Sequence, residues 1–178
     1  MNYDDLLDRY EAFFAAEVEE YFLLFSRSVF VFISGLAAFK IYRETGGDSL
    51  WTSRGLECMK EFKLWTEQGS SWNFEHKLQL MEAEHLYCCG DFELAAESYK
   101  NAITSAKAHK YINDEALACE LAGKFFLDRG NVSLSLEYLR LAHEKYSEWK
   151  AYGKANRLFE FINATFFNRC NLQCQDGS

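Results

Sequence analysis

Apolar residues along most of this chain recur every three or four positions, which is the spacing of one face of an α-helix. A typical run is Leu94, Ala95, Tyr99, Ala102 and Ala106. This spacing differs from the strict alternation expected of a half-buried β-strand, so the pattern predicts an all-α chain. The expected helices span roughly residues 3–25, 28–45, 49–68, 74–89, 92–109, 113–129, 132–147 and 150–167.

Short glycine-containing segments separate these runs. They are TGGDS at 45–49, EQGSS at 67–71, CGD at 89–91 and RGN at 129–131. Glycine commonly follows a helix because it adopts the left-handed conformation without steric cost. The chain contains no proline, a residue that disrupts helix interiors. Both observations favour helices joined by short turns.

The segments around Gly90 and Gly130 match each other at an offset of 40 residues. Each unit consists of a helix, a glycine-containing turn and a second helix, and the apolar face left over on one hairpin is covered by the next. The sequence therefore predicts a right-handed stack of antiparallel helix hairpins, an α-solenoid of about eight helices. We expect one domain over residues 1–168 and a disordered tail over 169–178. The matched pairs are Leu86 with Phe126, Tyr87 with Leu127, Tyr99 with Leu139, Ala102 with Ala142, and Ala106 with Tyr146.

The stretch EAEHLYCCGDFELAAESYKNAI resembles a tetratricopeptide hairpin. Ala83 stands at the small position of its first helix, Leu86 at the large apolar position and Gly90 at the turn. The stretch ELAGKFFLDRGNVSLSLEYLRLAHEKY is similar. The 40-residue offset exceeds the usual period of 34, and the proline after the second helix is absent. The resemblance therefore implies a long, irregular, tetratricopeptide-like repeat.

A narrower resemblance covers about residues 28–161. The segments NFEHKLQLMEAE, NDEALACELAGKFFLDRG and YLRLAHEKYSEWKAYGKANRLFE look like the helical-repeat region of large predicted STAND/AAA-type ATPases and hybrid histidine kinases. The resemblance implies a repeat that links catalytic domains in such proteins. Because this chain has no GxxxxGK[ST] phosphate loop, the resemblance transfers no ATP chemistry.

The net charge and the N-terminal sequence bear on which partners and which cellular location the chain can have. The net charge of −8 disfavours nucleic-acid binding, which needs a basic face. The start, MNYDDLLDRYE, lacks a signal-peptide pattern, so we expect a cytoplasmic location. A membrane span within 21–39 is disfavoured because its uncharged part, 28–39, is too short. We expect the helix to break near residues 26–28 instead.

Adjacent Cys88 and Cys89, with Glu82 and His85 nearby, raise the question of a metal or redox site. Neighbouring side chains on a helix diverge by about 100°, so the two thiols are poorly placed to hold one ion. Free cysteine often acts as a small apolar residue. We therefore predict no metal, no cofactor and no catalytic residues, and expect that the chain is not an enzyme.

The remaining candidate is the surface that the repeat creates. In a tetratricopeptide stack the first helix of each hairpin lines the concave face, which suits a protein or peptide segment with apolar anchors. We expect a non-catalytic interaction module or scaffold; the alternative is a regulatory repeat fragment of a larger signalling ATPase or histidine kinase, acting in cis. Whether the chain's own flanking helices fill the groove, and whether the chain self-associates, stays open. The predicted groove residues are Lys77, Leu80, Glu84, Tyr87, Leu117, Glu120, Lys124 and Leu127.

Overall fold

The computed structural model describes residues 20–47 and 49–167, and this part of the chain is helical without any β-strand. The all-α prediction is therefore confirmed for these residues. Seven α-helices are present here, whereas about eight were expected for the whole chain. The expected helix 3–25 and the tail 169–178 fall largely or wholly outside the described residues. The helices are α2 (Glu20–Glu44), α3 (Ser49–Gln68), α4 (Ser71–Cys89), α5 (Phe92–Ala108), α6 (Ile112–Asp128), α7 (Val132–Glu148) and α8 (Tyr152–Ile162), followed by a π-helical turn, η1 (Asn163–Phe167).

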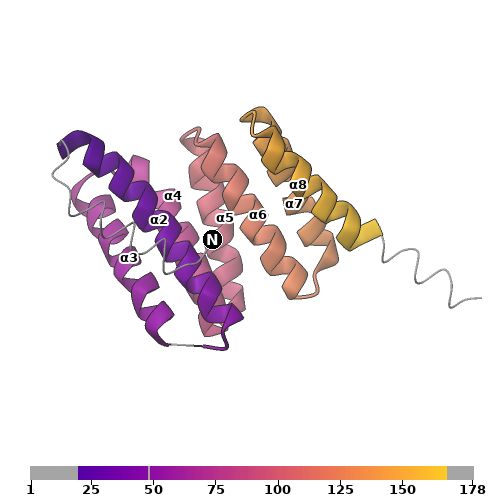
Figure 1. The fold of residues 1–178 in the computed structure, drawn as a ribbon, viewed down its shortest axis with the longest axis horizontal. Helices are drawn as coiled ribbons and strands as arrows, with labels where there is room; N and C mark the ends of the chain where they lie inside the picture. Colours follow the sequence, from indigo (N-terminus) through magenta and orange to yellow (C-terminus); the bar gives the residue numbers. More distant parts are fainter. Residues whose placement is uncertain (1–19, 48, 168–178) are drawn as a thin grey trace, which may run out of the picture.

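The helices lie side by side in chain order, each packed on its sequence neighbour (Figure 1). In addition, α2 packs on α4, and α4 packs on α6. Among alternate helices, α2, α4 and α6 therefore lie next to one another. A continuous apolar core runs through the helix row, which is why each hairpin needs its neighbours to bury its apolar face.

Four successive turns share one geometry at 20-residue intervals. Gly90, Lys110, Gly130 and Lys150 each have a positive φ, between 62° and 84°. After each of them, the next backbone amide donates to a carbonyl five residues earlier, at 2.8–3.0 Å. This is the Schellman arrangement that ends a helix in a left-handed residue. The two segments that match at an offset of 40 residues therefore have turns of the same geometry at Gly90 and Gly130.

Residues paired by the 40-residue offset occupy similar core positions. Tyr99 and Leu139 are both fully buried, as are Ala102 and Ala142. The close packing of α6 on α7 depends on Gly123, where an added Cβ would lie 2.6 Å from Cγ of Leu139. The repeat therefore has a regular backbone with locally different side-chain packing.

The expected helix break near residues 26–28 is wrong, because α2 continues through it. The guanidinium of Arg27 lies 2.8 Å from the carboxylate of Glu61 on α3, so a partner within the hairpin compensates its charge. No helix in the described ranges is long and apolar enough to cross a membrane.

Candidate functional site

A groove of about 930 Å³ opens at one edge of the helix row. This edge, which we call the groove edge, contains the turns at Gly69, Lys110 and Lys150; the turns at Gly90 and Gly130 lie at the opposite edge. The groove is lined by the first part of α2, the end of α3, the beginnings of α4 and α6, and the end of α7. Because alternate helices are antiparallel, these chain-distant segments meet at one edge.

The walls of the groove are mainly apolar. Val29 and Ile33 on α2 are 41% and 47% exposed, and Leu64 on α3 is 47% exposed. Across from them lie Leu117 and Trp149, the latter 53% exposed. Contiguous apolar surface of this kind, with polar groups beside it, is typical of a binding site.

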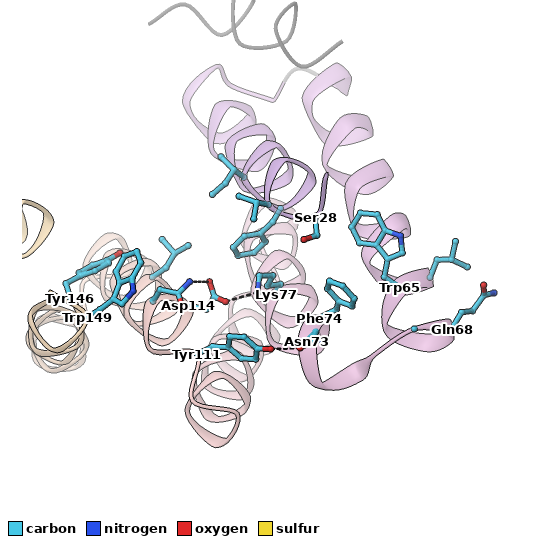
Figure 2. A pocket seen from close by; sticks show the side chains of 17 residues that line it. Ser28, Trp65, Gln68, Asn73, Phe74, Lys77, Tyr111, Asp114, Tyr146 and Trp149 are labelled. Atoms are coloured by element: carbon cyan, nitrogen blue, oxygen red, sulfur yellow. Dashed lines mark hydrogen bonds and ion pairs between the residues drawn. The ribbon is translucent and has the colours of Figure 1, made fainter. Parts of the chain in front are cut away.

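A polar cluster lies between the two walls (Figure 2). The carboxylate of Asp114 on α6 accepts hydrogen bonds from the ammonium of Lys77 at 2.7 Å and from Asn113 at 3.0 Å. It also lies 2.8 Å from Nε2 of His76, whose ring stacks on Tyr111 with centroids 4.5 Å apart. The cluster fixes the beginning of α6 against the beginning of α4.

Burial and ion pairing set the charge state of this cluster. Burial lowers the pKa of His76, which favours a neutral imidazole. Burial alone would raise the pKa of Asp114, but the hydrogen bond from His76 and the charge of Lys77 lower it overall. The cluster therefore presents a compensated Lys77–Asp114 ion pair beside a neutral imidazole.

Only two of the eight predicted groove residues, Lys77 and Leu117, line this groove. Leu80, Glu84 and Glu120 are 1–3% exposed, so the structure places these three predicted groove residues in the interior of the helix row. The other three predicted residues lie outside the groove: Lys124 is exposed, whereas Tyr87 and Leu127 are half-buried. The hydroxyl of Tyr87 donates to Asp128 at 2.8 Å, which joins α4 to α6.

Buried Glu84 on α4 has a structural role. Its carboxylate lies 2.5 Å from the guanidinium of Arg43 on α2 and accepts a hydrogen bond from the hydroxyl of Tyr99 on α5. Burial and the Glu84 charge raise the pKa of Tyr99, which keeps its hydroxyl a donor. Burial would lower the pKa of Arg43, but the Glu84 charge raises it overall.

Buried Glu120 on α6 has an equivalent arrangement. Its carboxylate accepts hydrogen bonds from Lys124 at 2.7 Å, from Lys154 on α8 at 2.9 Å and from the hydroxyl of Tyr146 at 2.8 Å. Burial would raise the pKa of Glu120, yet the two lysines lower it overall. This carboxylate is therefore held ionised between three helices.

Three ion pairs therefore connect successive even-numbered helices. Arg43–Glu84 joins α2 to α4, Lys77–Asp114 joins α4 to α6, and Lys154–Glu120 joins α6 to α8. We call them the inter-hairpin ion pairs. Sequence reasoning missed them because the partners are 34 to 41 residues apart, and no local pattern identifies which distant charge meets a buried carboxylate.

The two adjacent cysteines have different surroundings. Sγ of Cys88 lies 3.3 Å from the carbonyl of Phe39 and 3.4 Å from the Arg43 guanidinium, and burial raises its pKa. Cys89 is exposed, 3.5 Å from Nε2 of His85. Among the described residues, no three histidine, cysteine or acidic side chains are grouped so that they could hold a metal ion.

Comparison with known proteins identifies one informative relative. No family model and no solved structure matches the chain. Over 118 residues the chain is 37% identical to hybrid signal transduction histidine kinase G of Dictyostelium discoideum. The match covers 66% of this chain and 3% of the kinase, so the chain corresponds to a small part of that protein. The similarity supports the hybrid-kinase part of the resemblance noted in the sequence.

Proposed function

We propose that this chain is a non-catalytic helical-repeat segment of a cytoplasmic signalling system, and that its groove binds a protein segment. The observation that carries the proposal is the 37% identity to part of a hybrid signal transduction histidine kinase. The matched region is a minor part of that kinase, so a regulatory or connecting role suits it better than the whole kinase activity.

The finer architecture that we propose is a right-handed, tetratricopeptide-like solenoid. Two observations support it: equivalent turns recur every 20 residues, and the alternate helices α2, α4 and α6 pack on one another. Solenoids of this kind expose broad surfaces on which partner proteins bind.

The groove suits an amphipathic helix better than a polar peptide. Exposed aliphatic side chains form one wall and Trp149 lies on the other, while the charges of Lys77 and Asp114 already compensate each other. A helix laid in such a groove binds through apolar residues spaced three and four apart. The partner segment lies in the same polypeptide if the chain acts in cis, and in another protein if it acts as a scaffold.

A chimeric kinase tests the proposal. The matched 118-residue segment of the Dictyostelium kinase is replaced by the whole of this chain, and histidine phosphorylation is measured. We expect phosphorylation to be restored by the unchanged sequence and lost with Ile33→Asp/Leu64→Asp in the groove. The matched control is Leu94→Asp/Phe159→Asp, which changes two apolar residues that lie outside the groove and are 54% and 53% exposed. The chimera with this control variant should be phosphorylated like the chimera with the unchanged sequence.

Folding of each replacement is checked by circular dichroism, because a collapsed groove variant would also lose signal. If the folded groove variant supports phosphorylation as well as the control does, the groove has no part in regulation. In that case a scaffold acting in trans is tested by photo-crosslinking from position 33 in cells.

A further inference from the structure

We propose that the protein segment bound in the groove is an acidic amphipathic helix, which places two carboxylates, seven residues apart, on Lys110 and Lys150. This inference rests on the proposed function, because it needs a groove that binds a protein segment. It adds the charge of that segment and the way in which it lies. Three features carry it: unpaired lysines at the groove edge, their backbone conformation, and the distribution of charge along the groove.

Two exposed lysines stand at the groove edge without an ion pair. Lys110 precedes the groove residue Tyr111, and Lys150 follows the groove residue Trp149 (Figure 2). Within residues 20–47 and 49–167, no carboxylate forms an ion pair with either ammonium. Lys107, in the last turn of α5, adds a third exposed lysine at the same edge. The edge therefore offers cations beside the groove in a chain whose net charge is −8.

The backbone at Lys110 and Lys150 is unusual. Each has a φ of 62°, in the left-handed region that is costly for a residue with a side chain. Glycine, which bears no such cost, stands at the equivalent turns of the opposite edge, Gly90 and Gly130. Residues held in unfavourable backbone conformations concentrate at functional sites. Lysine at this edge is therefore better explained by what its ammonium binds than by the folding of the turn.

The carboxylates nearest in sequence to these two lysines are already paired. Asp114, between the two walls of the groove, binds the ammonium of Lys77 at 2.7 Å. Glu148, at the end of α7, binds the ammonium of Lys145 at 3.0 Å. Because these acidic groups have their own cations, a carboxylate for Lys110 has to come from the bound segment.

The opposite wall of the groove has no net charge. On α3, Lys63 and Glu67 stand on either side of the wall residue Leu64, and both charged residues are exposed. The groove is therefore apolar and neutral along α3, and apolar and positive beside α6 and α7. A bound helix complements this distribution if its apolar residues run along the whole groove and its carboxylates lie at one end only.

The spacing of the carboxylates follows from the repeat. Lys110 and Lys150 occupy equivalent turns one hairpin apart, before α6 and before α8. The Lys154–Glu120 ion pair joins these two helices, so the step between the turns is about one interhelical distance, or about 10 Å. Seven residues of a helix also cover about 10 Å and complete nearly two turns, so residues i and i+7 face the same side. Carboxylates at this spacing reach both lysines at once.

Selection from a displayed peptide library tests the charge of the segment. The library presents helices with a fixed stripe of leucines and with glutamate, glutamine or lysine at every flanking position, and it is selected on the full chain. We expect enrichment of glutamate at two positions seven apart, near one end of the helix. Enrichment of glutamine or lysine there, or no preference, overturns the proposal.

Fluorescence anisotropy then assigns the preference to the two lysines. The selected peptide is compared with a copy that has glutamine in place of the two glutamates. Lys110→Gln/Lys150→Gln should weaken binding of the acidic peptide about fivefold at low ionic strength, as expected for two exposed ion pairs, and leave the glutamine copy unaffected. The control Lys60→Gln/Lys100→Gln makes the same charge change at exposed positions within α3 and α5 and should weaken neither. Equal weakening of both peptides by Lys110→Gln/Lys150→Gln, or none, would show that these lysines do not pair with the segment.

Failure of this inference and failure of the proposed function give different results. If the glutamine copy binds as tightly as the acidic peptide and Ile33→Asp/Leu64→Asp abolishes both, the groove binds a segment but the assigned charge is wrong. If that groove variant binds unchanged, or if no peptide is selected, binding in the groove fails and the inference fails with it. A dimer of the chain that Ile33→Asp/Leu64→Asp dissociates would show that a second copy occupies the groove, which also overturns the acidic helix.

Discussion

Replacing Arg43 by methionine leaves the buried carboxylate of Glu84 without its cation. Removing one partner of a fully buried ion pair costs about 3–5 kcal/mol. The side chain of Arg43 is 22% exposed, and the Tyr99 hydroxyl still donates to the carboxylate. Because hydrogen bonding and partial exposure soften the penalty, we expect Arg43→Met to lower the free energy of unfolding by about 2–3 kcal/mol.

Urea unfolding followed by circular dichroism measures this loss. In a double-mutant cycle, Glu84→Gln together with Arg43→Met should cost less than the two single changes combined, by about 1–3 kcal/mol. The control is Glu44→Gln, which breaks an exposed Lys40–Glu44 pair within α2 and should cost less than about 1 kcal/mol. A loss below about 1 kcal/mol for Arg43→Met, or strict additivity in the cycle, would refute the reasoning.

Three further predictions follow from local geometry. Gly123→Ala should destabilise the protein by about 1–3 kcal/mol because its Cβ would collide with Leu139. Gly153→Ala, in α8 with no atom close to the added Cβ, should stabilise the protein by about 0.5–1 kcal/mol. Thermal melting of the two variants compares these effects. Lys110→Gly should raise the free energy of unfolding by about 0.5–1 kcal/mol, and so raise the urea midpoint, because glycine relieves the strain of a positive φ. An unchanged or lower midpoint would argue against that strain. Because burial lowers the pKa of His76, the unfolded state takes up a proton first as pH falls below 6.5, and stability decreases towards the folded pKa. The urea midpoint should therefore be lower at pH 5.5 than at 7.5, and the difference should shrink in His76→Gln.

The helical fold could be predicted from the sequence because apolar spacing and turn residues are local signals. The 40-residue match of Gly90 and Gly130 correctly placed their two turns. The helix ends at about 109 and 147 were expected, but the left-handed turn residues Lys110 and Lys150 were not identified, because lysine is not a usual residue for a left-handed turn. Their structural equivalence became visible only from the backbone.

The binding surface was harder to predict. Leu80 and Glu84 were assigned to the concave face that the first helix of a hairpin lines, and both are buried. Arg43 and Tyr99 cover the carboxylate of Glu84, and neither contact follows from spacing within α4. The groove itself is assembled from segments as far apart as Val29 and Trp149. A sequence pattern shows which face of a single helix is apolar, whereas the groove depends on how five helices are placed relative to one another.

The inter-hairpin ion pairs also determine how the molecule carries mechanical load. An apolar contact between helices is non-directional and tolerates sliding, but the hydrogen bonds within an ion pair weaken when the partners move apart or tilt. Sliding one even-numbered helix along the next would pull a buried carboxylate away from its cation. The row of hairpins should therefore resist shear and move as a stiff bar, so that a displacement at α2 arrives at α8 with little loss.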